Sequence, residues 1–248
     1  GRWTLCTTAT AQAFPAIGYF LGHDLREHLN VPVGLVATSM GGSSSQAWTS
    51  REALEARPAL KSMMDAFRRD EAALREKTKV YETRTVPQWQ EANQAWRRDV
   101  LPAYQKELTT WNEAVKQAKA AGQPEPPKPQ PSTPRPNLAA PPNRMTPTVL
   151  YNGMIAPLAP FAIKGVAWCQ GEHNTFDPKL YADLLPTMIN DWRQHWGQPN
   201  LPFVYVQNAH NGPNGNGGLN FGKWASVRDA QYKLDDPHTA MVVAVDVG

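Results

Sequence analysis

The chain reads VGLVATSMGG from Val33 to Gly42 and IKGVAWCQGEHN from Ile163 to Asn174. Each segment begins as a short apolar run and breaks directly into small and polar residues, the pattern of a buried parallel strand that delivers a loop to the carboxyl edge of a sheet. Open α/β folds bind their ligands at that edge. The two segments therefore predict a parallel α/β sheet with a site where the two loops meet.

Patterns on both sides of these segments extend the predicted fold. Apolar residues at helical spacing between residues 13 and 29 stop before Pro32, and strands and helices alternate after residue 149. Such alternation indicates βαβ units. We expect strands at residues 33–37, 163–169, 203–207 and 241–246, helices at 13–29, 46–56, 181–196 and 224–232, and a loop rich in glycine and asparagine at 208–222.

The middle of the chain has a different composition and is predicted to be an insertion. Residues 59–121 carry apolar residues at steps of three, four and seven, which predicts a helical hairpin with Pro87 near its turn. Trp89, Trp96 and Trp111 are interpreted as its seam, with a sugar-stacking platform as the alternative. Residues 122–148 are rich in proline and predict an extended return segment. Residues 1–58 and 149–248 then form the two parts of the α/β domain.

Composition and charge exclude several classes of protein. The net charge of +3 is spread over the chain, so nucleic acid is not expected as a partner. Cys6 and Cys169 form neither a disulfide framework nor a zinc motif, and His23 and His28 lack the i, i+4 spacing of metal ligands. We therefore expect no metal and no cofactor. No apolar run is long enough to span a membrane, and the first residues lack the layout of a signal peptide.

Residues 37–41, ATSMG, allow two interpretations. They lie between a predicted strand and a helix and are close to the GxSxG nucleophile elbow of α/β-hydrolases, with alanine as the first residue. Ser39 would then be the nucleophile and would need a base such as His210 or His238 together with an aspartate. Alternatively, Ser39 and the serines at 43–45 satisfy hydrogen bonds of a turn and a helix N-cap.

Longer segments resemble a known family. The run VPVGLVATSMGGSSSQAWTSREAL at residues 31–54 and, above all, LYNGMIAPLAPFAIKGVAWCQGEHN at 150–174 are similar to the sialate O-acetylesterase family of SGNH-type carbohydrate esterases. Residues 202–207, WASVRDAQ at 224–231 and VVAVDVG at 242–248 resemble later segments of that family. The resemblance implies a three-layer α/β/α SGNH-hydrolase-like fold with the helical hairpin inserted.

The resemblance also implies removal of O-acetyl groups from sugars by a serine, a histidine and an aspartate. The serine of such enzymes belongs to a GQSN-type motif, and the histidine and aspartate belong to a DxxH-type motif. Neither motif occurs in this chain. We therefore expect those segments in flanking sequence or in an associated chain, and we expect the chain to begin after processing or partway through a longer gene product.

The middle of the site carries over from the family residue by residue. Gly41 and Gly42 match its WGG element, with Met40 in place of tryptophan, and are implied to donate backbone N–H groups to an oxyanion hole. Gln170 of QGE is implied to add a side-chain donor. Glu172 is implied to brace the loop; the alternative for Gln170 and Glu172 is a buried polar pair that only holds the strand end.

The two residues after Glu172 are candidates for substrate contact. His173 replaces the serine of the family's QGESN, and Asn174 keeps its asparagine. We interpret both as substrate-binding residues.

Three functional hypotheses follow. The first is an acetylated-carbohydrate esterase whose serine and histidine segments lie elsewhere; the second is a self-contained serine hydrolase that uses Ser39; the third is a non-catalytic sugar-binding or assembly module. A homo-oligomer or an association with a chain that supplies the other segments is the expected assembly. The resemblance implies a secreted or periplasmic location.

Overall fold

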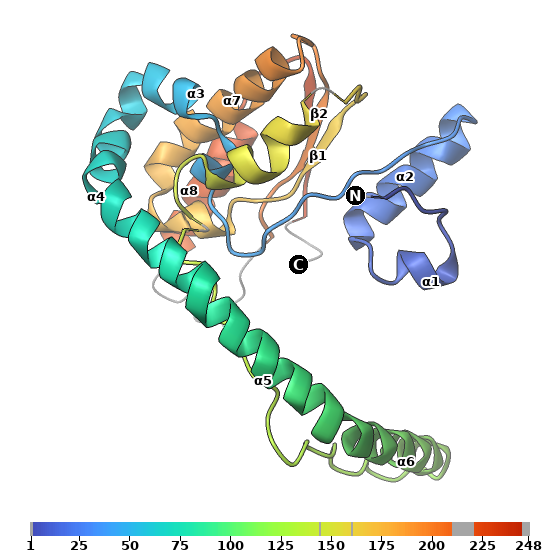
Figure 1. Cartoon of the computed structure of the whole chain (residues 1–248). Coiled ribbons are helices and arrows are strands. Elements are labelled where there is room, and N and C mark those ends of the chain that lie inside the picture. Colours follow the sequence, from blue (N-terminus) through green and yellow to red (C-terminus); the bar gives the residue numbers. More distant parts are fainter. Residues whose placement is uncertain (1, 144, 160, 210–220, 245–248) are drawn as a thin grey trace. The chain divides into compact units, whose positions relative to one another are not determined.

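The computed structural model describes residues 2–143, 145–159, 161–209 and 221–244 (Figure 1). The chain divides into two compact units, one formed by residues 1–68 and 144–248 and the other by residues 69–143. The strands of the described residues all lie in the first unit. They are β1 (Val166–Trp168), β2 (Phe203–Val206) and β3 (Thr239–Val242).

The three strands form one parallel sheet in the order β1-β2-β3, with Val166 opposite Phe203 and Phe203 opposite Thr239. Helix α7 (Pro178–His195) connects β1 to β2, and α8 (Phe221–Tyr232) precedes β3. The predicted α/β class with a parallel sheet is confirmed. Strands 163–169, 203–207 and 241–246 are found in shortened or shifted form, and the helices predicted at 181–196 and 224–232 are found close to their predicted ends.

Helices α7 and α8 cover the same face of the sheet. Side chains two residues apart on a strand point to one face, and on β2 the ring centroid of Phe203 lies 5.9 Å from that of Trp192 on α7. The Tyr205 hydroxyl, on the same face, donates to the backbone oxygen of Gln231 on α8 at 2.8 Å. Phe203 and Tyr205 are both buried.

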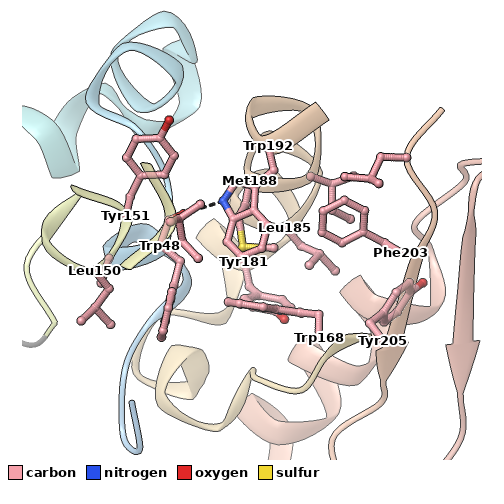
Figure 2. Packing of buried hydrophobic residues seen from close by; sticks show 14 of the residues in the cluster. Trp48, Leu150, Tyr151, Trp168, Tyr181, Leu185, Met188, Trp192, Phe203 and Tyr205 are labelled. Atoms are coloured by element: carbon pink, nitrogen blue, oxygen red, sulfur yellow. Dashed lines mark hydrogen bonds between the residues drawn. The ribbon is translucent and has the colours of Figure 1, made fainter. Parts of the chain in front are cut away.

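The main core of this unit is built around three tryptophans (Figure 2). The Trp168 ring stands edge-on to both Trp48 and Trp192, with centroids 5.8 Å away in each case. The indole N–H of Trp192 donates to the Trp48 backbone oxygen at 2.8 Å. Because each aromatic ring buries a large apolar area, this cluster joins the segment after the first loop to the sheet and to α7.

A buried carboxylate fixes the same segment to α7. Asp191 is only 2% exposed, and it accepts hydrogen bonds from the hydroxyl of Ser50 at 2.6 Å and from its backbone N–H at 2.7 Å. Ser50 is also the N-cap of α3 (Arg51–Ala56), since its hydroxyl accepts from Ala53 N at 3.2 Å. The helix predicted at 46–56 is thus split into the 3-10 helix η1 (Ser45–Trp48) and α3.

Five further helical segments belong to the first unit. Its N-terminal part contains α1 (Thr8–Ala11) and α2 (Ala16–Leu29), where a helix was expected at 13–29. The others are η2 (Pro58–Leu60), the π-helical η4 (Tyr151–Ile155) and the 3-10 helix η5 (Ala156–Leu158).

The strand predicted at residues 33–37 is wrong. The described structure has no strand there, and the segment packs instead on α2, where a Cβ added to Gly22 would lie 2.6 Å from the Leu35 side chain. Val36 is 51% exposed. A β-strand is stabilised by hydrogen bonds to a neighbouring strand, and none of the described residues pairs with this segment.

The second unit contains three stretches of helix in direct succession. Helix α4 (Lys61–Val80), which begins in the first unit, passes through the π-helical η3 (Tyr81–Thr85) into α5 (Val86–Asp99), and α6 (Leu101–Ala120) follows. The turn expected near Pro87 lies at Val100 instead. Pro87 is in the first turn of α5, and the wider π turn before it accommodates a residue that lacks the N–H of a regular helix.

The proline-rich return segment covers the tryptophans of the second unit. Helix α6, which the structure describes in full, has no buried residue, so it does not close the predicted seam. Aromatic side chains of the helices donate instead to backbone oxygens of residues 126–139, which we call the strap. The pairs are Tyr81 with Ala139 at 2.9 Å, Trp89 with Pro136 at 3.0 Å, Trp96 with Thr133 at 2.7 Å and Trp111 with Pro126 at 2.9 Å.

Candidate functional site

The loop after β1 carries the predicted site residues Gln170, Glu172, His173 and Asn174, the last three in the 3-10 helix η6 (Glu172–Phe176). Gln170 is 7% exposed. Its Nε2 donates to the Ser43 backbone oxygen at 3.1 Å and to Asn174 Oδ1 at 2.7 Å. The loop after β1 therefore lies against the loop that follows residues 33–42, as expected from their sequence pattern.

Asn174 completes this amide network. Its Oδ1 also accepts from the Ser45 backbone N–H at 2.9 Å, and its Nδ2 donates to Gln46 Oε1 at 3.1 Å. A backbone N–H can only donate, so the bond from Ser45 fixes which atom of the Asn174 amide is oxygen. That choice in turn requires Gln170 to present its nitrogen. The orientation of both amides follows from one backbone contact.

Both hydrogens of Gln170 Nε2 are used in these two bonds, and Gln170 Oε1 is buried without a hydrogen-bond partner in the described structure. An oxyanion that binds to Nε2 must therefore compete with Ser43 O or with Asn174 Oδ1. A buried polar atom without a partner is costly and marks a place where a ligand atom can bind.

Gly171 allows a close approach between β1 and β2. A Cβ at this position would lie 2.5 Å from Asn208 Oδ1, which is shorter than any ordinary contact. Asn208 is 4% exposed and follows the end of β2, and its Nδ2 lacks a partner among the described residues. A glycine at position 171 is therefore required by the geometry of the sheet edge.

Gln231 is a site residue that the sequence did not reveal. It is fully buried on α8, and its Nε2 lies 3.3 Å from the backbone oxygens of both Gln170 and Val206. Its Oε1 accepts from the Asn208 backbone N–H at 2.9 Å. One side chain thus holds the ends of β1 and β2. One feature of the sequence could have indicated its burial. Gln231 lies four residues after Val227 and so on the same face of the helix, and Val227 is also fully buried.

Gly41 and Gly42 are exposed, and Gly42 has a φ of 67°, a left-handed conformation that favours glycine. None of the hydrogen bonds found within the described residues uses their N–H groups. The nearby Ser43 hydroxyl donates to the Met40 backbone oxygen at 2.7 Å and accepts from the Trp48 indole at 2.9 Å. The two glycine N–H groups are therefore available as donors next to Ser43 and Gln170.

Ser39 is exposed and does not lie in the strand-turn-helix context of a nucleophile elbow, since residues 33–44 contain neither strand nor helix. His238 precedes β3 and so lies at the amino-terminal edge of the sheet, away from Gln170. His210 and most of the predicted loop at 208–222 lie outside the described residues.

Glu172 and His173 are placed at the outer side of the loop. The Glu172 side chain is exposed, and its backbone oxygen accepts from the Thr175 hydroxyl at 2.7 Å. The ring of His173 lies 5.0 Å from that of Phe176.

Burial dominates the electrostatics around this loop. It raises the pKa of the Tyr181 phenol well above its usual range, and this hydroxyl donates to Gln170 O at 2.9 Å. Cys169 is exposed as a residue, but partial burial raises the pKa of its thiol, and the charge of Glu172 raises it further. Both groups therefore stay protonated at neutral pH.

Searches for other kinds of site give two results. The described residues contain no group of three or more His, Cys, Asp or Glu side chains arranged to hold a metal ion. Within the same residues, no helix has the length and apolar character needed to cross a membrane.

Sequence comparisons relate the chain to one family of enzymes. Residues 143–248 match the family model described as carbohydrate esterase, sialic acid-specific acetylesterase. The mouse sialate O-acetylesterase is 27% identical over 244 residues, which cover 94% of this chain and 37% of the mouse protein. The rat enzyme is 30% identical over 200 residues, covering 77% of this chain and 29% of the rat protein. The chain thus spans less than half the length of these curated relatives.

A solved structure supports the same assignment. The crystal structure of a carbohydrate acetylesterase from Xanthomonas citri superposes with a TM-score of 0.61 at 27% sequence identity, covering 100% of this chain and 38% of that chain. Sequence and fold together confirm that this chain resembles the sialate O-acetylesterase family of carbohydrate esterases.

Proposed function

We propose that this chain forms the central part of a carbohydrate O-acetylesterase that hydrolyses acetyl esters on sugars. The observation that carries the proposal is the amide network in which Gln170, Asn174 and the backbone at Ser43 join the two predicted loops. The network holds Gln170 in one orientation, and the oxyanion would take over one of its two N–H donors from Ser43 O or Asn174 Oδ1.

In the proposed reaction a serine oxygen attacks the acetyl carbonyl carbon and loses its proton to a histidine. The carbonyl oxygen becomes an oxyanion, which accepts hydrogen bonds from Gln170 Nε2 and from the N–H groups of Gly41 and Gly42. The intermediate then expels the sugar oxygen, which takes the proton from the histidine. Water hydrolyses the acetyl-serine to acetate and restores the serine.

The serine and histidine belong, in this proposal, to segments that the 248 residues do not contain. The comparisons are compatible with this because the chain covers 37% of the mouse relative. Glu172 is proposed to brace the loop through its position at the start of η6, and His173 and Asn174 are proposed to contact the sugar.

Intact-mass spectrometry after treatment with a fluorophosphonate tests the proposal against its main alternative. The probe adds covalently to an activated serine. No adduct is expected on the folded chain. An adduct that maps to Ser39 and disappears in Ser39→Ala would show instead a self-contained hydrolase.

A second test separates an esterase from a non-catalytic sugar-binding module. In the longer polypeptide that carries the proposed serine, Gln170→Ala is expected to lower kcat by about 10²-fold to 10³-fold, the usual loss for one oxyanion donor. Asn190→Ala, which removes an exposed amide side chain on α7, is the control. Equal rates for the two variants would favour the binding module.

Location and assembly are also part of the proposal. We propose a secreted or periplasmic protein, which fractionation of the source cells tests. Size-exclusion chromatography with light scattering tests the proposed homo-oligomer or associated chain, and a monomer that hydrolyses acetyl esters alone would contradict it.

A further inference from the structure

A cavity of about 350 Å³ lies beside the amide network in the first unit. Ser44, Gln46 and Asn174 belong to its wall, so a molecule bound in it lies next to the loop that carries Gln170. Its inner part includes Leu184, which is 1% exposed and belongs to a second small core with Leu54, Leu60 and Met64. The cavity is thus built on a packed base, and its volume falls in the range of small-molecule sites.

An exposed aromatic ring forms part of the same wall. Phe176 is 72% exposed. Exposure of an aromatic ring to water is unfavourable, and a ligand that covers the ring would relieve this cost. The Phe176 ring is tilted by 55° against that of His173 at a centroid distance of 5.0 Å. Its flat apolar face, in the same wall as the polar side chains of Ser44 and Asn174, matches the C–H face of a pyranose ring.

Polar groups of the wall retain hydrogen-bonding capacity. Asn174 Nδ2 donates a hydrogen bond to Gln46 Oε1, while no hydrogen bond found within the described residues uses Gln46 Nε2. The Ser44 hydroxyl donates to the Met145 backbone oxygen at 3.3 Å and keeps its lone pairs. Asp177 stands at the N-cap of α7, yet its side chain makes no capping bond. These groups can donate to and accept from sugar hydroxyls.

The charge of the wall discriminates between kinds of sugar. Among the described residues that line the cavity there is no lysine or arginine, and Asp177 contributes a carboxylate. The exposed Glu172 lies in the same short helix as Phe176. A sialic acid brings its own carboxylate, which these charges repel, whereas a neutral sugar is unaffected.

We propose that this cavity binds the ring of a neutral O-acetylated pyranose and disfavours sialic acids. The inference rests on the proposed function, because it names the substrate class of the same site. Phe176 stacks on the ring, Asp177 and Gln46 bond its hydroxyls, and Asn174 links the sugar subsite to Gln170.

Binding to the folded 248-residue chain tests the inference by saturation-transfer NMR and calorimetry at pH 8. The probes are methyl 6-O-acetyl-glucopyranoside and the methyl glycoside of 9-O-acetyl-N-acetylneuraminic acid. The neutral probe is expected to bind about tenfold more tightly than the anionic one. Phe176→Ala should weaken the neutral probe about tenfold, while Tyr232→Ala, which removes an equally exposed ring (72%), should change nothing.

Asp177→Asn separates charge from shape. It should improve binding of the anionic probe several-fold, leave the neutral probe nearly unchanged and reduce the salt dependence of the difference, since Glu172 keeps its charge. Tighter binding of the sialic acid probe would overturn the inference and leave the proposed esterase intact. The same holds if neither probe binds, because Gln170→Ala in the longer polypeptide tests the esterase independently.

Discussion

Replacing Ser50 by alanine should destabilise the first unit more than any ordinary serine substitution. Its hydroxyl both donates to the buried carboxylate of Asp191 at 2.6 Å and caps α3 through Ala53 N. A hydrogen bond to a charged group contributes about 1.5–3 kcal/mol, and an N-cap serine contributes about 1 kcal/mol. Since the two share one oxygen, we expect a loss of about 3 kcal/mol in the free energy of unfolding.

The loss should depend on pH. Burial raises the pKa of Asp191, whereas the bonds from Ser50 lower it. Removing the hydroxyl therefore raises the pKa of the folded carboxyl further above its unfolded value. The native state then holds its proton more tightly than the unfolded chain, so stability falls as the pH rises through that range. Ser50→Ala should consequently cost more at pH 7 than at pH 3.

Urea unfolding followed by pulsed hydrogen exchange of peptides from α3 and α7 measures this unit alone. With a urea dependence of about 2 kcal/mol/M, the midpoint should fall by about 1.5 M. Ser226→Ala is the matched control, because its exposed hydroxyl only donates to Gly222 O within α8 and should cost about 0.5 kcal/mol or less. Equal losses in the two variants, or a loss independent of pH, would refute the reasoning.

Three further predictions concern the site and the strap. Gly171→Ala should cost about 1–3 kcal/mol in urea unfolding, because its Cβ meets a buried amide at 2.5 Å, whereas Gly153→Ala has nothing within 4 Å and should cost little. Trp96→Phe removes the indole N–H that donates to the strap at Thr133 O, so limited proteolysis at residues 123–137 should become several-fold faster. Alkylation of Cys169, measured with the other cysteine replaced by serine, should rise with pH beyond the usual thiol range, because the pKa of its thiol is raised.

Each of these has a clear opposite result. Equal stability of the two glycine variants would mean that the neighbouring amide moves freely. Unchanged proteolysis would show that the indole bond does not hold the strap. Full reactivity of the thiol at pH 8 would contradict its raised pKa.

The sequence predicted those elements whose pattern has one physical explanation. Helix α7 and strands β1 and β2 were found because their apolar periods match a buried helix and buried parallel strands. The contact of Gln170 with the backbone at Ser43 was also predicted, although the strand at 33–37 on which that prediction relied is absent from the described structure.

Other features depend on partners that a local pattern does not identify. The apolar run at 33–37 is compatible with a strand, but a strand also needs a neighbour, and the described residues provide none. The spacing of Trp89 and Trp96 predicts an apolar stripe equally well whether a helix or an extended strap covers it. Gln231 was missed because a polar residue on a helix is normally exposed, and only the tertiary structure shows it fully buried.

The spacing of the hydrogen bonds between the strap and α5 is nearly the same along both segments. Trp89 and Trp96 are seven residues apart, and the backbone oxygens that they bind, those of Pro136 and Thr133, are three residues apart. Seven residues of α-helix rise about 10.5 Å, and three residues of polyproline-type chain rise about 9.3 Å. If seven residues were added to the helix or deleted from it, together with three residues of the strap, the remaining hydrogen bonds between tryptophans and strap would stay in register. The helix and the strap of the second unit could therefore lengthen or shorten together in steps of about 10 Å.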